Sequence, residues 1–378
     1  PFTGARLDVP IAGVRTGGRK SFPWAAASVV KDGGDDPDVT HGLRLEVRAG
    51  LDFRALSETP RAGENSPAPL LIGGFSSPVF LYAGRGIGRV TLPGLPVPPG
   101  EPAINPEPRR QIAAAACEAA AAHGCSGSLH LRLCAPSGEE RAKDTLNPRL
   151  GIVGGISILG TRGIVRPYSN EAWQAVIIQG INVAAAAGIS TLLLSTGRRS
   201  EDLLRALYPD LPPPAAVQAA DFAAFSLRQA GKNACIHRVA WGCFPGKLLK
   251  LAQGLEWTHA RSAPADIASL ARLWEKCGAP ETAAVAAMPT ASGALSLMRK
   301  ISPEGYGLVL AALTERAFAV MEGWLRADSR KDAPPDLSLH VFSLEGEILA
   351  SRRGPPFQAE EIRGNFTLNG YRQRENAP

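Results

Sequence analysis

A dense group of acidic residues lies in the stretch KDGGDDPDVTHG, from Lys31 to Gly42. Clustered carboxylates of this kind suit a metal loop, a general-base site, or a turn in which Asp side chains bind the backbone just ahead of them. A calcium loop of the EF-hand type needs acids at its first, third and fifth positions and Glu at its twelfth. Counted from Asp32, the third position is Gly34 and the twelfth is not Glu. The spacing therefore predicts an ordered turn without a metal.

The members of this turn are expected to differ in their roles. Asp35 and Asp38 are expected to hold the turn, because Asp beside Pro is common turn chemistry. Asp36 and His41 are the candidate catalytic residues, since a carboxylate or an imidazole that faces a ligand can move a proton. The alternative is that all four side chains only stabilise the turn.

Two further loops combine Gly, hydroxyl groups and arginines just before a predicted helix. They are GTRGIVRPYSNE, residues 160–171, and STGRRSED, residues 195–202. Their arginines are Arg162, Arg166, Arg198 and Arg199. A guanidinium group binds carboxylates with two parallel hydrogen bonds, and a helix N-terminus attracts anions. These loops therefore predict a binding site for an anionic ligand. The alternative is that Ser169 and Ser200 are helix N-caps and that the arginines are solvated.

Other catalytic patterns are weak or missing in the sequence. The stretch GRGIGRVTLPG, residues 84–94, lacks the spacing and the following helix of a dinucleotide fingerprint. His259, in WTHAR, is by itself more typical of a hydrogen-bonded structural residue. No Ser/His/Asp triad, HExxH motif or P-loop is present, so hydrolase and phosphotransferase functions have no support.

The composition is that of a globular protein. The 378 residues are 45% hydrophobic and 20% charged, with a formal net charge of +6. This length allows two domains. The basic excess suits an anionic small molecule better than a nucleic acid, because no basic run is interleaved with aromatic residues. The six cysteines show neither CxxC nor zinc spacing, which favours reduced thiols in the cytoplasm.

The apolar runs, including residues 172–187, are too short or too interrupted to span a bilayer. No membrane association is therefore expected. The composition is compatible with a homo-oligomer.

Residues 1–148 are predicted to form an α+β domain that contains the acidic turn. The alternating segment GLRLEVRAGL is typical of a half-buried strand. The Pro-rich stretch TLPGLPVPPGEPAINPEPRR excludes a regular helix and is expected to be extended and ordered. An Ala-rich helix is predicted over residues 109–123, and SGSLHLRLCAP is predicted to form the strand that follows.

Residues 149–378 are predicted to form an α/β domain. The strands predicted in GISILG, ISTLLLS and ACIHRVAWG alternate with helices predicted in SNEAWQAVIIQGINVAAAAG, SEDLLRALY, DFAAFSLRQAG and PGKLLKLAQG. This alternation predicts a mostly parallel, Rossmann-like sheet with helices on both faces. The segment LSLHVFSLEGEILA predicts a hairpin. Ligands of such sheets bind beyond the C-terminal ends of the strands, where both arginine-containing loops would lie.

Several segments together resemble one known family. VVKDGGDDPDVTHG, GRGIGRVTLPGLPVPPGEPAINPEPR, TLNPRLGIVGGISILGTRGIVRPYS and STGRRSE are similar to the signature segments of the CbiD family, and they stand in the same order. PGKLLKLAQG and WTHAR resemble its later motifs. The sequence differs from the family pattern at GCFPGK, where Cys243 stands in place of a His.

The resemblance implies a cobalt-precorrin-5B C1-methyltransferase that forms cobalt-precorrin-6A in cobalamin biosynthesis. S-adenosylmethionine would be the methyl donor, and cobalt would be held only within the corrinoid substrate. Such a substrate carries many carboxylates, which suits a basic protein with Arg-rich loops. Methyl transfer from a sulfonium needs positioning more than acid–base catalysis, which agrees with the missing catalytic triad.

The resemblance also implies which residues bind the methyl donor and which bind the substrate. The residues expected to bind the methyl donor are Gly160, Thr161, Thr196, Gly197, Ser200 and Glu201, with Glu201 as the candidate for the ribose hydroxyls. The residues expected to bind the anionic substrate are Arg149, Arg166, Arg198, Lys247 and His259.

Two other functions remain open from the sequence. A non-catalytic corrinoid-binding or carrier protein would keep the arginines but would not need a pocket for the methyl donor. A nucleotide-binding oxidoreductase could use the same type of sheet, although the glycine fingerprint fails. Titration with S-adenosylhomocysteine separates the methyltransferase from the carrier.

Overall fold

The computed structural model describes residues 9–35, 38–56, 69–73, 78–160, 169–259, 264–329 and 334–354. Its internal contacts divide the chain into two compact units, Pro1–Ala187 and Gly188–Pro378. The sequence predicted a boundary at residue 148. The difference arises because the described residues between 149 and 187 pair and pack with the first unit.

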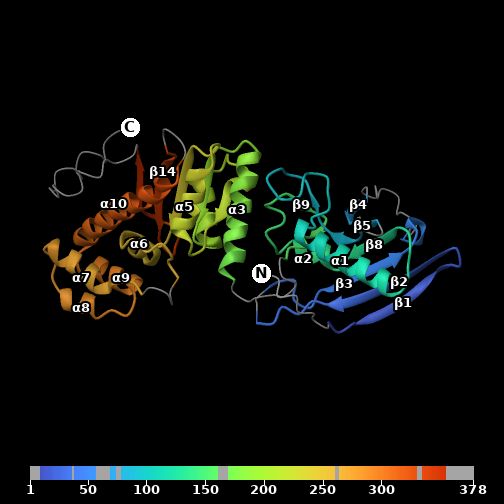
Figure 1. Ribbon diagram of the computed structural model, residues 1–378. Coiled ribbons are helices and arrows are strands. Elements are labelled where there is room, and N and C mark those ends of the chain that lie inside the picture. Colours follow the sequence, from blue (N-terminus) through green and yellow to red (C-terminus); the bar gives the residue numbers. More distant parts are fainter. Residues whose placement is uncertain are drawn as a thin grey trace. The chain divides into compact units, whose positions relative to one another are not determined.

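A six-stranded sheet with the order β1-β2-β3-β8-β5-β4 forms the body of the first unit (Figure 1). Its strands are β1 (Gly13–Arg19), β2 (Phe22–Val30), β3 (Arg44–Gly50), β4 (Leu70–Gly73), β5 (Val79–Ala83) and β8 (Leu129–Cys134). Neighbouring strands are antiparallel except β5 and β8, which are parallel. A parallel pair needs a crossover connection, and the helix α1 (Pro106–Ala122) lies in this one.

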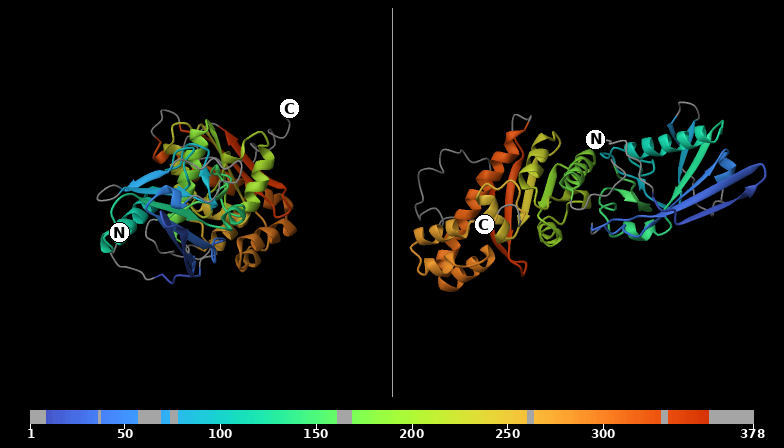
Figure 2. Two further views of the ribbon diagram at one scale, coloured as in Figure 1. Left: turned by 90° about the vertical axis from the view of Figure 1, so that its right-hand side faces the viewer. Right: turned by 60° about the horizontal axis from the view of Figure 1, so that its bottom comes forward.

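One face of this sheet is covered by α1 (Figure 2). Side chains alternate between the faces of a strand, so Leu81 and Leu131 point to the same side. There they join a buried cluster against which Ile112 and Ala116 of α1 pack. The helix starts at Pro106, earlier than the predicted residue 109, because Pro is tolerated in a first turn, where its missing N–H costs nothing.

Two short strand pairs extend the first unit past residue 148. The pairs are formed by β6 (Gly86–Ile87) with β10 (Gly155–Ile156), and by β7 (Arg89–Val90) with β9 (Ile152–Val153). The segment GISILG thus forms only a short strand of the first unit. The helix α3 (Asn170–Ala186) buries Val183 against Val90 and Ile152. Its N-cap is Ser169, whose hydroxyl accepts a hydrogen bond from the N–H of Ala172 at 3.2 Å. The unit also contains the 3₁₀ helix η1 (Phe53–Leu56) and the helix α2 (Gly138–Ala142).

The second unit is built on a five-stranded sheet with the order β12-β11-β13-β14-β15. Its strands are β11 (Thr191–Ser195), β12 (Ala216–Gln218), β13 (Arg238–Cys243), β14 (Asp336–Phe342) and β15 (Ile348–Gly354). The first four are parallel, and β15 is antiparallel to β14. Every residue of β11 is buried, as expected for a parallel strand that is covered on both faces.

Helices cover both faces of this second sheet. The unit contains α4 (Arg198–Leu207), α5 (Ala223–Lys232), α6 (Pro245–Ala252), α7 (Ile267–Lys276), α8 (Thr282–Ala286), α9 (Ala291–Ile301) and α10 (Pro303–Ala327), with the 3₁₀ helix η2 (Pro213–Ala215), and α7, α8 and α9 pack on other helices. Leu204 of α4 packs on the face that carries Leu193 and Ala240. The opposite face is covered by α10, whose Glu315 accepts a hydrogen bond from Arg352 of β15 at 3.0 Å (Figure 1).

The mixed α/β class predicted from the sequence is confirmed. The strands predicted in ISTLLLS and ACIHRVAWG form β11 and β13, and the predicted hairpin forms β14 and β15. Two further features of the second unit differ from the prediction. The helix α4 begins at Arg198 rather than at Ser200, and β12 was not predicted because three residues after a Pro-rich stretch are too few to show a periodicity.

Among the residues that the structure describes, no helix combines the length and the apolar character needed to cross a membrane.

Candidate functional site

The described residues of the acidic stretch, 31–35 and 38–42, lie in the connection between β2 and β3. Its backbone closes with hydrogen bonds from Gly42 N to Lys31 O at 2.9 Å and from Lys31 N to Leu43 O at 2.9 Å. The carboxylate of Asp38 accepts a hydrogen bond from Thr40 N at 2.8 Å and also binds the amine of Lys31. Burial by itself would raise the pKa of Asp38, but these hydrogen bonds from Lys31 and Thr40 hold it below its ordinary value. Asp38 therefore has a structural role in the turn.

His41 lies in the same turn, and 58% of its side chain is exposed. Its Nδ1 accepts a hydrogen bond from Gly33 N at 3.0 Å, so the ring proton is on Nε2 when the imidazole is neutral. Asp32 accepts from Gly34 N at 2.8 Å in the manner of an Asx turn. Asp36 lies outside the described residues. Within the described ranges, no group of three or more His, Cys, Asp and Glu side chains could hold a metal ion.

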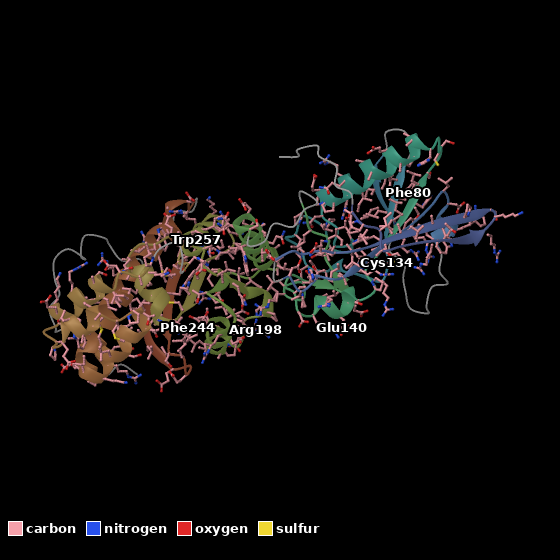
Figure 3. The ribbon with its side chains drawn as sticks, turned by 90° about the horizontal axis from the view of Figure 1, so that it is seen from below. Phe80, Cys134, Glu140, Arg198, Phe244 and Trp257 are labelled. Atoms are coloured by element: carbon pink, nitrogen blue, oxygen red, sulfur yellow. The ribbon has the colours of Figure 1, made fainter. Side chains whose placement is uncertain are left out.

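In the second unit, the loops after β11 and β13 leave the sheet side by side. Ser195 at the end of β11 is paired with Gly242 near the end of β13. The helices α4 and α6 start just beyond these strands, so two helix N-termini lie at the same edge of the sheet. The guanidinium carbon of Arg199 is 6.0 Å from the ring centroid of Phe244, which confirms that the loops are neighbours. Figure 3 labels Arg198 and Phe244 at this edge.

Hydroxyl groups shape the loop between β11 and α4. Thr196 Oγ1 lies 3.2 Å from Ser200 Oγ, which donates a hydrogen bond to Gly197 O at 2.9 Å. Ser200 thus stabilises the first turn of α4, and Glu201 in the same turn is only 1% exposed. The backbone at Gly197 is extended, and a Cβ there would meet no atom of a described residue within 4 Å. Neither the backbone conformation nor packing against the described residues requires glycine at this position, whereas a ligand close to the backbone would.

A charged cluster lies at the end of β12 and the start of α6. Lys247 Nζ binds the carboxylate of Asp221 and donates to Thr258 O at 2.8 Å. Thr258 Oγ1 donates to the same carboxylate oxygen of Asp221 at 3.2 Å. Lys250 Nζ donates to Thr258 O at 3.1 Å and to His259 O at 3.0 Å. Burial first, and then the charge of Lys247, lowers the pKa of Lys250. The two lysines thus fix the chain at residues 258–259 above the strand ends.

Three stacked rings continue from this cluster. The ring centroids of Phe222 and Trp257 are 6.2 Å apart at an interplanar angle of 17°, and those of Trp257 and His259 are 5.5 Å apart at 22°. Trp257, labelled in Figure 3, is 38% exposed. A partly exposed indole face is a surface on which a planar ligand can stack.

The backbone next to Asp221 is strained. Ala220 has a φ of 49°, in the left-handed region that costs about 1–2 kcal/mol for a residue with a side chain. Ala219 N donates to Ser195 O at 2.8 Å, which ties the end of β12 to the end of β11. Strain of this kind is often held at ligand-binding sites, and Ala220 directly precedes Asp221, which binds Lys247.

The structure gathers part of the predicted site. Five of the predicted residues lie at the end of β11, namely Thr196, Gly197, Arg198, Ser200 and Glu201. Two others, Lys247 and His259, lie near the neighbouring strand ends. Arg149 and His41 belong to the first unit, and Gly160 ends a described segment of that unit. Thr161 and Arg166 lie outside the described residues.

Sequence reasoning missed Asp221, Thr258 and the stacking of Trp257 at this edge. Asp221 was assigned to the start of a helix, because the short strand β12 before it was not recognised. An acid just after a strand is the signal that could have identified it. Cys243, which stands where the family has a His, is fully buried, and burial raises the pKa of its thiol to about 12. It therefore remains a neutral, inert thiol.

Two family models match the chain. The model described as CbiD matches residues 2–167, and the model described as CbiD, C-terminal domain, matches residues 257–353.

Curated relatives of similar length are named cobalt-precorrin-5B C(1)-methyltransferase. The protein of Nitratidesulfovibrio vulgaris is 47% identical over 351 residues, which cover 92% of this chain and 81% of the relative. The protein of Geobacillus thermodenitrificans is 44% identical over 77% of this chain and 73% of its own length. A crystal structure of the cobalamin biosynthesis protein CbiD from Archaeoglobus fulgidus is 26% identical over 60% of this chain and 62% of that chain, with a TM-score of 0.27.

Proposed function

This chain belongs to the CbiD family, and from that premise we propose that it methylates C1 of cobalt-precorrin-5B to give cobalt-precorrin-6A in cobalamin biosynthesis. The observation that carries the proposal is the 47% identity, over 92% of the chain, to a relative with this name. The protein would thus be a transferase of one-carbon groups, acting on an anionic cobalt-corrinoid.

We propose further that the second sheet is Rossmann-like and that S-adenosylmethionine is the methyl donor. The chain passes from β11 to β12 on one side and then to β13 on the other side of β11, so the strand order reverses between β11 and β13. Nucleotide ligands of doubly wound sheets bind at such a reversal. A Cβ at Gly197, in the loop after β11, or at Gly246, in the first turn of α6, would meet no atom of a described residue within 4 Å, so a ligand could approach the backbone at both positions.

The residues at this edge fit the parts of such a donor. Trp257 offers a partly exposed ring for stacking of the adenine. Asp221 follows the second strand of the unit, which is where an acid binds ribose hydroxyls in related sheets. Oδ1 of Asp221 accepts hydrogen bonds from Lys247 and Thr258. Oδ2 of Asp221 accepts no hydrogen bond from another described residue. Glu201, the other candidate for the ribose, would have to leave its buried position.

When bound, the donor supplies a methyl group on a sulfonium, which is already a good leaving group. The chain's own contribution is then positioning, because a preorganised alignment of the two reactants lowers the barrier by removing entropy before the reaction. The lysine pair holds residues 258–259 in place, and the two loops define where the donor lies. His41 and Asp36 remain the proposed groups for a proton lost or gained around C1.

The proposal is tested with purified protein, S-adenosylmethionine carrying a labelled methyl group, and cobalt-precorrin-5B. The expected product has gained one labelled methyl group at C1, as read by mass spectrometry and NMR. Binding of the corrinoid without methylation, together with no affinity for S-adenosylhomocysteine, would instead identify a carrier.

The ribose contact is tested with two matched variants. Asp221→Asn is expected to weaken S-adenosylhomocysteine binding by about tenfold, the size of one charge-assisted hydrogen bond. Glu201→Gln is the comparison. If only Glu201→Gln weakens binding, Glu201 binds the ribose hydroxyls and the proposal for Asp221 is wrong.

A further inference from the structure

A groove lies at the edge of the second sheet opposite to the proposed donor site. Two of the residues that line it, Thr191 and Arg238, are the first residues of β11 and β13. Ser338 of β14 and Arg353 of β15, which are register partners, line it as well. The donor site is proposed at the other ends of the parallel strands, so this groove is a separate feature of the same unit.

The groove forms where the helix α4 ends and leaves part of the sheet open. Ala240 of β13 is buried on the same face of the sheet as Leu204 of α4. Side chains alternate along a strand, so Arg238 points to this face too, as does Ser338, the register partner of Ala240. Residues 207–211, at the end of α4 and just beyond it, form the rest of the lining. The cavity between them has a volume of about 360 Å³.

Two arginines determine the charge of the groove. Neither the guanidinium of Arg238 nor that of Arg353 has a hydrogen bond or an ion pair with another described residue. One acid, Asp210, also lines the groove. Asp336, the register partner of Arg238, is not part of the lining and forms no ion pair with either arginine. The lining residues therefore carry an excess of positive charge, and both guanidinium groups can bind a ligand.

Hydroxyl groups and a fixed aromatic ring complete the lining. Thr191 is buried, and in the described part of the chain neither its hydroxyl nor that of Ser338 is hydrogen-bonded to another residue. The ring of Tyr208 is held by a hydrogen bond between its Oη and His340 Nε2 at 3.1 Å. His340 Nδ1 is in turn 2.8 Å from Ser351 Oγ. A lining that is already held in place loses less conformational freedom when a ligand binds.

We propose that this groove binds a small oxyanion, the phosphate or carboxylate group of a metabolite, through Arg238 and Arg353. A guanidinium group binds either oxyanion with two parallel hydrogen bonds. The hydroxyl groups of Thr191 and Ser338 supply further donors. A cavity of about 360 Å³ accommodates such a ligand but cannot enclose a corrin macrocycle. The inference goes beyond the proposed function, because this ligand is additional to the methyl donor and to the corrinoid.

The experiment is a calorimetric titration of the full chain with inorganic phosphate in Tris buffer of low ionic strength. Saturable binding is expected, with a dissociation constant of about 1 mM or less. Arg238→Gln and Arg353→Gln should each weaken it about tenfold or more. Arg316→Gln is the matched control, because Arg316 is exposed on α10, which covers the opposite face of the sheet. The same titration with succinate distinguishes a phosphate ligand from a carboxylate ligand, and either result supports the proposal.

Further controls separate binding at the groove from folding and from binding at the donor site. The arginine variants should keep the melting temperature of the unaltered protein, because both side chains are exposed. If a Gln variant does not fold, Arg353→Lys is used, which keeps the charge and loses the two-pronged hydrogen bonding. Asp210→Asn should strengthen anion binding or leave it unchanged, because an acid in the lining repels an anion.

Saturating S-adenosylhomocysteine should leave phosphate binding unchanged, because the donor site is proposed at the other edge of the sheet. The proposal is overturned if neither anion binds the unaltered protein, if both arginine variants bind it normally, or if S-adenosylhomocysteine displaces it. A failed methylation assay with normal phosphate binding would contradict the proposed function alone.

Discussion

The acidic turn of the first unit and the strand ends of the second unit use acids in different ways. In the turn, the partners of Asp38 are Lys31 and Thr40, which lie only seven and two residues away in the sequence. At the strand ends, the partners of Asp221 are Lys247 and Thr258, which are 26 and 37 residues away. The acids that are clustered in the sequence therefore stabilise local structure. The contacts between residues that are distant in the sequence form a surface that can bind a ligand.

The largest effect is expected from breaking the long-range cluster. Lys247→Met leaves the carboxylate of Asp221 with one hydrogen bond fewer and without its cation, which should cost about 1.5–3 kcal/mol of unfolding free energy. Affinity for S-adenosylhomocysteine should fall as well, because residues 258–259 lose an anchor. Denaturant unfolding and calorimetric titration measure the two effects. Lys276→Met, at an exposed position, is the control, and an equal response in both variants would contradict the special role of the cluster.

Histidines of the two units also lie in different environments. His41 of the turn is exposed, whereas His340 is buried and binds Tyr208 Oη at 3.1 Å and Ser351 Oγ at 2.8 Å. Burial first, and then the charge of Arg353, lowers the pKa of His340 from 6.5 to about 4. The unfolded chain therefore takes up this proton first, and stability should fall as the pH drops from about 6.5 towards about 4.

Between about pH 7 and about pH 5 the expected loss from His340 is about 2 kcal/mol. Urea unfolding at both pH values measures it. His340→Gln should remove this part of the pH dependence, and a variant that keeps the full slope would show that another group causes it.

A smaller effect is expected in the turn. Asp38→Ala should lower the unfolding free energy by about 1 kcal/mol, because a partly exposed, local pair contributes little. The lowered pKa of Asp38 stabilises the fold above its ordinary value of 3.8, and this contribution is lost as the pH falls through the lower pKa of the folded state. Acid unfolding of the two proteins tests this. A loss as large as that of Lys247→Met would remove the distinction between the two regions.

The smallest effect on stability is expected for Asp36→Asn and His41→Ala. If these residues serve the chemistry, each variant should melt normally and bind both ligands, yet turn over far more slowly. If they only hold the turn, methylation rates should follow stability. Single-turnover rates, compared with those of Asp32→Asn in the same turn, distinguish the two roles.

Local patterns predicted several of the helices and strands of both units, but not the helices α7 to α10. Buried runs such as TLLLS became β11, and the Ser169 cap marked the start of α3. The boundary at 148 differed because β9 and β10 are two residues long, and strand pairing over such lengths has no periodicity to read. The loop STGRRSED was correctly expected at a strand end. Asp221 and Trp257 were not associated with it, because their approach depends on the order of strands in the sheet.

The strand ends of the second unit are the proposed site of the methyl donor, and a bulky side chain at Gly197 would occupy that site. A Cβ at this position meets no atom of a described residue within 4 Å, so Gly197→Leu should fold normally while filling the space over the loop. Gly307→Leu is the control, since a Cβ on that residue of α10 also meets nothing within 4 Å. Gly197→Leu is expected to keep its melting temperature and to lose measurable binding of S-adenosylhomocysteine in calorimetric titration. Binding with unchanged affinity in the folded variant would contradict it.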